Sequence, residues 1–241
     1  MLTQIMTEMF KFKRSKVLWI IVLLIVLDCF SSYLQSQVKD LSWEEFLRAS
    51  YMNLWIRPVF FCFLSGYLFT RDEEQRTLSA LFTYPYRRSQ WYFAKLTAAA
   101  VVIAFLLLVS FAFELIIGLL LLSEPLTFAN LGYQLAFLVQ TWLLYIALTP
   151  LAAFIAILVK KSILCAIASA GGGIMSMPLG VVSSKYITLS PWLIPYLFSY
   201  YPLNIPDYPV WEPGLLVSGI LLVLSMGLGL YIYTKKDLIY E

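Results

Sequence analysis

The longest apolar stretch of the chain covers residues 91–122 and reads WYFAKLTAAAVVIAFLLLVSFAFELIIGLLLL. Only two of its residues, Lys95 and Glu114, are charged. A helix needs about 20 mostly apolar residues to cross a bilayer, so this stretch can cross one and still tilt or project beyond it. Of the 241 residues in the chain, 61% are hydrophobic and 13% are charged. Because a soluble domain is about half apolar and a quarter charged, the sequence predicts an integral membrane protein.

Five further stretches have the length and apolar character of a membrane span. The six predicted spans are residues 17–34, 54–69, 91–122, 131–159, 163–182 and 214–234. No repeat or low-complexity linker divides the chain. We therefore predict one all-α polytopic domain over residues 1–241, with six transmembrane helices.

The lysines and arginines are divided unevenly between the two sets of connections. The richer set is Lys11, Lys13, Arg14, Lys16, Arg71, Arg76, Arg87, Arg88, Lys95, Lys160, Lys161, Lys235 and Lys236. The poorer set is Lys39, Arg48, Arg57 and Lys185. Since cytoplasmic connections carry the excess of basic residues, this division predicts that both termini are cytoplasmic and that the number of crossings is even.

The first 16 residues have the pattern of a short helix that lies in the membrane interface. Apolar residues recur at helical spacing and basic residues follow them. The apolar residues are Leu2, Ile5, Met6, Met9 and Phe10, and the basic ones are Lys11, Lys13 and Arg14. We expect an interfacial helix that contacts membrane lipids; the alternative is a disordered basic tail.

The second connection, residues 70–85, has the pattern of a short amphipathic helix. Thr70 and Glu73 have the spacing of a capping box, and Pro85 would end the helix. Asp72, Glu73 and Glu74 would lie at the positive end of its dipole. Its predicted apolar stripe is Leu78, Leu81 and Phe82. We expect the stripe to rest on the membrane or to dock into a groove on a soluble protein; a solvated loop is the alternative.

The last external connection, residues 185–213, is rich in both proline and aromatic residues. Its prolines are Pro191, Pro195, Pro202, Pro206, Pro209 and Pro213. Its aromatic residues include Trp192, Tyr196 and Phe198. This composition favours short helices that dip into the outer leaflet, although an aromatic belt that anchors the ends of two spans would also account for it.

Two acids, Asp28 and Glu114, lie inside predicted spans. Asp28 is about 18 Å along a helix from Lys16, and Glu114 is about 28 Å from Lys95, which places both in the outer half of the membrane if the lysines mark the inner surface. Buried acids in a membrane are costly and are often functional. They would either attract a cationic substrate or form an internal pair with Arg57.

Several functional classes find little support in the composition. There is no histidine, which removes the commonest general base and metal ligand. Ser65-Gly66 superficially resembles an intramembrane serine protease site, but such a serine needs a basic partner. The three cysteines lie in apolar runs without paired spacing, so we expect them to be packing residues. No dense basic face suggests nucleic acid binding.

Two short motifs resemble those of ABC-2 type exporter permeases. One is the basic start Glu8-Met-Phe-Lys11-Phe-Lys13-Arg14-Ser15. The other is Glu74-Gln-Arg-Thr-Leu78 followed by Tyr84-Pro-Tyr-Arg-Arg88 and Lys95, which is similar to the family's cytoplasmic loop after the second span. In its start and size the chain is most similar to bacitracin-resistance and lantibiotic-immunity permeases of bacterial plasma membranes.

The resemblance implies roles for several segments. The first 14 residues would be the elbow helix, and residues 71–84 the coupling helix that contacts an ATP-binding subunit. The coupling residues would be Glu73, Glu74, Arg76, Leu78, Leu81 and Phe82. Residues 186–201 would form a re-entrant outer gate with Trp192, Tyr196 and Phe198. Two permease chains would work with two ATPase chains.

The chain itself contains no phosphate-binding loop of the G-x-x-x-x-G-K-[ST] type. We therefore expect no cofactor and no catalytic residue in this chain, with ATP and Mg²⁺ held by the partner. Gly171, Gly172 and Gly173 lie within a predicted span and are better explained by close helix packing. The expected function is export of a hydrophobic or amphipathic substrate, such as an antimicrobial peptide. An intramembrane enzyme and a sensory or accessory membrane subunit are the alternatives.

Overall fold

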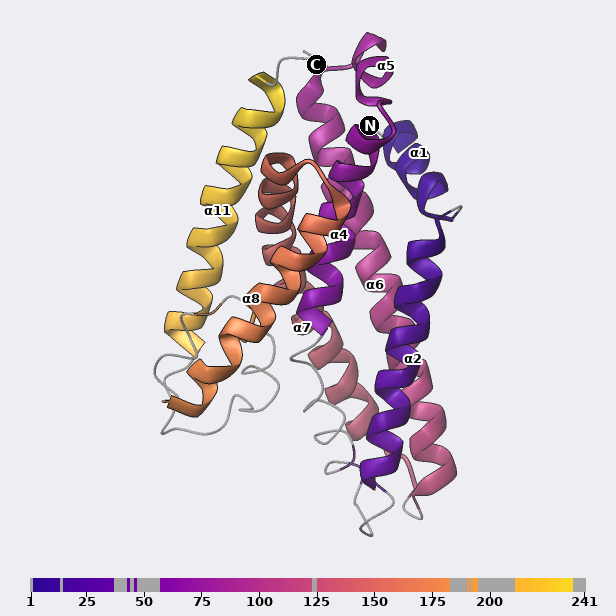
Figure 1. Ribbon diagram of the computed structural model, residues 1–241. Helices are drawn as coiled ribbons and strands as arrows, with labels where there is room; N and C mark the ends of the chain where they lie inside the picture. The colour runs from indigo at the N-terminus through magenta and orange to yellow at the C-terminus, as the bar shows by residue number, and fades with distance from the viewer. Residues whose placement is uncertain are drawn as a thin grey trace.

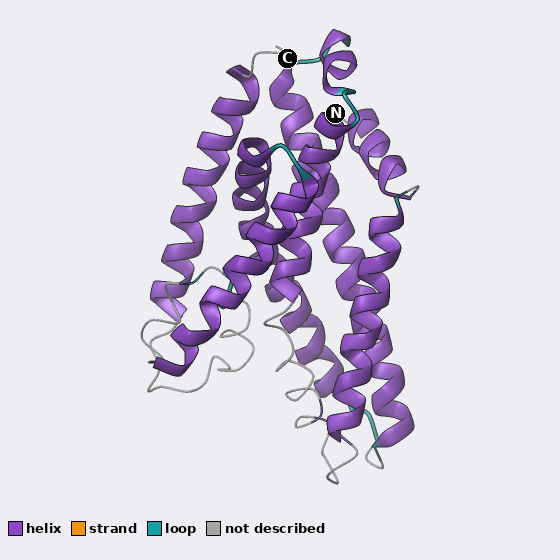
Figure 2. Cartoon of the chain, in the orientation of Figure 1, coloured by secondary structure: helices purple, strands orange, loops and turns teal. Residues whose placement is uncertain are grey.

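The computed structural model describes residues 2–13, 15–36, 43, 46, 57–122, 125–182, 190, 192–194 and 211–235, and within these ranges the regular structure is helical, with no strand (Figure 2). Two helices are short: α1 (Leu2–Lys13) and α5 (Leu78–Thr83). The long helices are α2 (Lys16–Ser36), α4 (Arg57–Glu74), α6 (Arg88–Leu121), α7 (Phe128–Val159), α8 (Ser162–Val182) and α11 (Trp211–Lys235).

Each long helix coincides with one predicted span, because each span is a continuous apolar run that a helix can cover. Three of them, Arg88–Leu120, Asn130–Val159 and Gly214–Lys235, have the length and hydropathy of a membrane span by those two criteria alone. The described apolar part of α8, Ser162–Met175, is shorter. The protein is thus a helical membrane protein, and a total of six crossings stays a prediction.

The long helices lie side by side, and α1, α5 and the last turn of α11 lie at one end of the bundle (Figure 1). Two hydrogen bonds fix this arrangement. Glu74 at the end of α4 accepts from the backbone nitrogen of Ser162 at 2.6 Å, and Arg88 at the start of α6 donates to the carbonyl oxygen of Thr234 in α11 at 3.0 Å. The basic connections after α4 and after α7 therefore lie at the same end, as the predicted topology requires.

Small residues allow α4 to approach its neighbours closely. A Cβ added to Gly66 would lie 2.2 Å from the Sγ of Cys165 in α8, and one added to Gly173 would lie 2.5 Å from Val59 in α4. A Cβ on Gly172 would lie 2.6 Å from the ring of Trp192. The expected close packing against another helix is thus confirmed for Gly173; Gly172 packs against an indole ring outside the long helices, and Gly171 has nothing within 4 Å.

The predicted start of the amphipathic helix at Thr70 is wrong. Helix α4 continues through this residue to Glu74, and the chain then turns at Arg76, whose φ is 53°. Thr70 Oγ1 does not cap a new helix; it contacts the carbonyl oxygen of Tyr67 at 3.3 Å and the hydroxyl of Ser162 at 2.9 Å. A threonine inside a helix commonly bonds to a carbonyl of the preceding turn, which the capping-box pattern alone does not reveal.

Candidate functional site

Four charged side chains gather where α1, α4 and α6 meet, and we call Glu8, Lys11, Asp72 and Lys95 the inner ion cluster. The Lys95 side chain is 0% exposed, and its Nζ donates to the carbonyl oxygen of Leu68 at 2.8 Å. The same nitrogen pairs with Asp72 Oδ2 and with Glu8 Oε2 at 3.4 Å. A lysine this deeply buried is stable only with such partners.

Lys11 completes the inner ion cluster from α1. Its Nζ lies 2.8 Å from Glu8 Oε1 and 3.0 Å from Asp72 Oδ1, so each acid contacts both lysines. Burial alone would raise the pKa of Asp72, but Lys95 and Lys11 outweigh it and hold the pKa below its ordinary value. Asp72 therefore stays ionised, and the cluster fixes α1 against α4 and α6.

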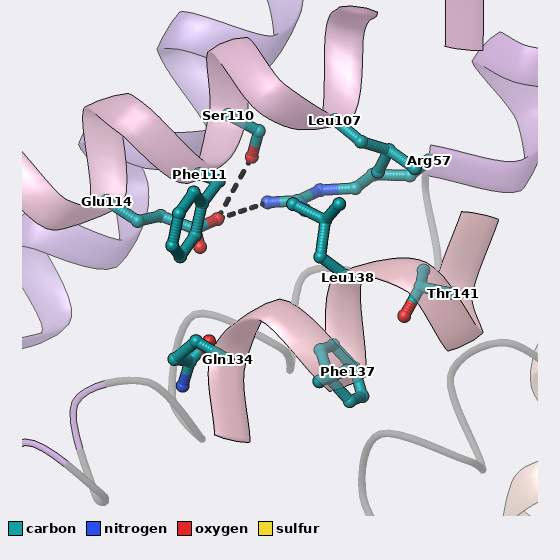
Figure 3. Close-up of a pocket in the computed structure, with 9 residues that line it drawn as sticks. All are labelled: Arg57, Leu107, Ser110, Phe111, Glu114, Gln134, Phe137, Leu138 and Thr141. Carbon is teal, nitrogen blue, oxygen red and sulfur yellow. Dashed lines mark hydrogen bonds and ion pairs between the residues drawn. The ribbon is translucent and has the colours of Figure 1, made fainter. Parts of the chain in front are cut away.

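An outer ion cluster consists of Asp28 in α2, Arg57 in α4 and Glu114 in α6. Arg57 Nε lies 3.0 Å from Asp28 Oδ2, and its Nη2 lies 2.9 Å from Glu114 Oε1. Ser110 donates its hydroxyl to the same Glu114 oxygen at 3.0 Å (Figure 3). The structure therefore contains the internal pairing with Arg57, which was one of the two alternatives for these acids. A role of the two acids in a substrate path stays a prediction.

A small cavity lies beside the outer ion cluster. Arg57 and Glu114 line it together with Gln134 and Thr141 of α7 (Figure 3). Its volume is about 20 Å³, which is room for roughly one water molecule. Among the described residues, the cavity that Glu114 lines is thus too small for a substrate.

The two ion clusters bind the same helices at their two ends. Helix α4 carries Arg57 at its first residue and Asp72 near its last, and α6 carries the complementary Glu114 and Lys95. Arg57 and Asp72 are 15 residues apart on α4, so the two clusters are about 22 Å apart along the helix at 1.5 Å per residue. Since α1 and α2 add a partner at each level, we call α1, α2, α4 and α6 the ion-linked unit. Within it, α4 and α6 are tied to each other at both ends, α1 joins them at the inner ion cluster and α2 at the outer ion cluster.

The predicted exposure of the apolar stripe on the second connection is wrong for the two described side chains, while their role in coupling stays a prediction. Leu78 is 4% exposed and Leu81 is 7% exposed, and both belong to the main apolar core. The side chain of Phe82 lies outside the described residues. Leu78 and Leu81 therefore attach the short helix α5 to the bundle.

Of the other predicted coupling residues, Glu74 caps a helix. Its two carboxylate oxygens accept from the backbone nitrogen and the hydroxyl of Ser162, at 2.6 and 2.9 Å, at the first turn of α8. Glu73 is half-buried and Arg76 is exposed. Among the described side chains after Glu74, which is itself exposed, the exposed residues of this connection are Gln75, Arg76, Thr77, Thr83, Tyr84, Pro85, Tyr86 and Arg87. They form a polar and aromatic surface, which we call the α5 surface.

The remaining predicted sites are only partly described. Trp192 lies against Gly172 of α8, whereas Tyr196 and Phe198 lie outside the described residues. An outer gate is therefore still a prediction. Ser65 is 0% exposed and donates its hydroxyl to the carbonyl oxygen of Phe61 at 2.8 Å, so it serves the helix backbone.

Sequence reasoning missed the inner ion cluster. Lys95 was interpreted as a marker of the membrane surface, and Asp72 as a helix-start residue. One signal was available: Lys95 interrupts an otherwise apolar stretch, and a cation in such a place needs an acidic partner. Which acid supplies it is a tertiary question, because Glu8 and Asp72 are 87 and 23 residues away.

The chain matches a known protein family. A family model described as "ABC-2 family transporter protein" matches residues 4–176 of the chain. No curated protein matches it. The matched range includes both ion clusters and α5.

Proposed function

Because the chain belongs to the ABC-2 family of transporter proteins, we propose that it is the permease subunit of an ATP-driven exporter in a bacterial plasma membrane. Membrane subunits of this family are generally not catalytic. ATP with Mg²⁺ would be hydrolysed by a separate ATP-binding subunit, and two permease chains would form the path. The substrate would be hydrophobic or amphipathic, for example an antimicrobial peptide.

The ion-linked unit supports this proposal most directly. Helix α5 follows α4 after a three-residue turn, and α4 is tied to α6 at both ends by buried ion pairs. A push on the α5 surface would therefore move α4, α6 and the N-terminal helices together. The motion would reach the outer ion cluster, about 22 Å away, and would widen the space between two protomers.

The outer ion cluster is compatible with a cationic substrate. Two carboxylates, Asp28 and Glu114, face the single guanidinium of Arg57, which leaves one formal negative charge if both acids are ionised. Widening of the adjacent cavity would expose this charge to the path. The proposal thus favours substrates that carry a positive group on an amphipathic body.

An alternative function, intramembrane catalysis, would need an activated nucleophile. Ser65 is the residue that suggested it, and its hydroxyl is bonded to a helix carbonyl. A sensory or accessory subunit that moves nothing is the other alternative. Both predict that no ATP-binding protein associates with the chain.

The test is to purify the chain together with any P-loop ATPase that accompanies it, and to measure ATPase stimulation by candidate peptides and lipids in lipid nanodiscs. Charge reversal of two exposed residues, Arg76→Glu and Arg87→Glu, should weaken the association without lowering thermal stability. Lys235→Glu, at the end of α11, is the matched control. Hydrolytic activity of the chain alone, or no associated ATPase, would refute the proposal.

A further inference from the structure

A cavity of about 450 Å³ opens beside the α5 surface, between α1, the turn after α4 and the start of α6. We call it the α1–α5 cavity. Thr3, Gln4 and Thr7 line one side, and Tyr84, Tyr86 and Trp91 line the other. This volume lies in the range of ligand pockets, and it is enough for a few residues of a polypeptide.

Buried polar groups without partners border the α1–α5 cavity. Gln4 is 2% exposed, and neither its amide nitrogen nor its amide oxygen has a hydrogen-bond partner among the described residues. The indole nitrogen of Trp91 is likewise buried and without a partner there. Buried polar groups are normally paired, so this combination points to a missing ligand. The Gln4 amide oxygen is a hydrogen-bond acceptor, and the Gln4 amide nitrogen and the Trp91 indole nitrogen are donors. Together they match an amide group on a ligand, because an amide both donates and accepts.

The charges around the α1–α5 cavity cancel. Lys11 and Asp72 both line it, but they are bonded to each other within the inner ion cluster. A ligand therefore gains little from a net charge at this contact. Tyr84 and Tyr86 at the rim are 59% and 44% exposed, and exposed aromatic residues are characteristic of protein interfaces.

The two sides of α1 separate a membrane contact from the cavity. Leu2, Met6 and Phe10 are 69%, 52% and 66% exposed and form an apolar stripe. Thr3 comes directly after Leu2, and Thr7 directly after Met6. Each threonine is therefore rotated by about 100° around the helix from the apolar residue before it. If the apolar stripe rests on lipid, the threonine side and the cavity are turned away from the acyl chains, towards a soluble partner.

We propose that the α1–α5 cavity receives a short segment of the ATP-binding subunit. A backbone amide of that segment would bond to Gln4 and to the Trp91 indole, and an apolar or aromatic side chain would lie against Leu81 and Tyr84. This inference rests on the proposed function, because it requires that subunit. The proposed binding adds a second contact beside the α5 surface, in which a cavity of the permease receives a segment of the ATP-binding subunit.

The experiment uses the complete permease and the P-loop ATPase identified by copurification. Thr7→Trp places a large ring at the mouth of the cavity on an exposed position, whereas Met6→Trp places the same ring on the apolar stripe. We expect Thr7→Trp to weaken ATPase binding about tenfold and Met6→Trp to leave it unchanged, with equal thermal stability. Equal binding by both variants would overturn the inference and leave the proposed function intact.

A photoreactive benzoylphenylalanine in place of Tyr84 identifies the occupant directly. Crosslinking to one peptide of the ATPase, lost in the Thr7→Trp background, supports the inference. Crosslinking to phospholipid or to a second permease chain overturns it. If the wild-type chain binds no ATPase at all, the proposed function itself fails.

Discussion

Replacing Lys95 with methionine tests whether the inner ion cluster holds α1, α4 and α6 together at their shared end. The methionine has similar length and fills the space, but it leaves the buried carboxylates of Asp72 and Glu8 with only Lys11 as a counter-ion. Removing one partner of a buried ion pair costs about 3–5 kcal/mol. Because Lys11 still contacts both acids, we expect the lower end, about 3 kcal/mol.

A loss of about 3 kcal/mol corresponds to a fall in Tm of roughly 6–12 °C for a chain of this size. We would measure it by intrinsic fluorescence of the protein in nanodiscs, at one fixed scan rate because membrane proteins often unfold irreversibly. The matched control is Lys161→Met, an exposed lysine after α7, which should change the stability by less than about 0.5 kcal/mol. Equal melting of the two variants would refute a structural role for the cluster.

The same cluster predicts a direction for the pH dependence. Since the pKa of Asp72 is held below its ordinary value, its contribution to stability is fully present above about pH 4 and is lost as the pH falls through the lowered pKa. In Lys95→Met one of the two cations is gone and the pKa of Asp72 is lowered less, so the acid-induced loss should be smaller and complete at a higher pH. The double variant Lys95→Met, Asp72→Asn should recover part of the stability, because it removes one of the two acids that share Lys11.

Other variants probe helix packing and the outer ion cluster. Gly66→Ala should destabilise the protein by about 1–3 kcal/mol, because its Cβ would meet the Sγ of Cys165, and adding Cys165→Ala should restore the melting temperature. Asp28→Asn with Glu114→Gln should reduce thermal stability, because it leaves Arg57 buried without a counter-ion. The triple variant with Arg57→Met should regain stability and lose export of cationic peptides. Undiminished export by the triple variant would exclude attraction of the substrate by these acids.

The long helices could be predicted from sequence because hydropathy is a property of continuous segments. Residues 91–122 predict α6 within a few positions, since no neighbouring residue offers the backbone an alternative in an apolar surrounding. The pairing of Asp28 and Glu114 with Arg57 could also be predicted, because the position of a residue along a helix axis follows from its residue number. The boundary between α4 and α5 could not be predicted from the sequence, because Asp72 and Glu74 are held by residues of α1, α6 and α8.

The direction of Leu78 and Leu81 shows a second limit. Their spacing correctly predicted an apolar face on a short helix, but spacing cannot say what that face contacts. In the structure it contacts the protein itself, so the surface left for a partner is built from Arg76, Tyr84 and Tyr86. Only the packing of α5 against the bundle distinguishes these outcomes.

The charged residues at the two ends of α4 affect how the nascent chain enters the membrane. Arg57 sits at the positive end of the helix dipole and Asp72 near the negative end, so both are unfavourable in the isolated helix. Each has one of its two ion-pair partners in α6, which ends 47 residues after α4. A nascent chain that stops before Glu114 therefore contains an arginine that only Asp28 neutralises. We expect α4 to settle in the bilayer only once α6 has joined it, so that the two enter as an antiparallel hairpin.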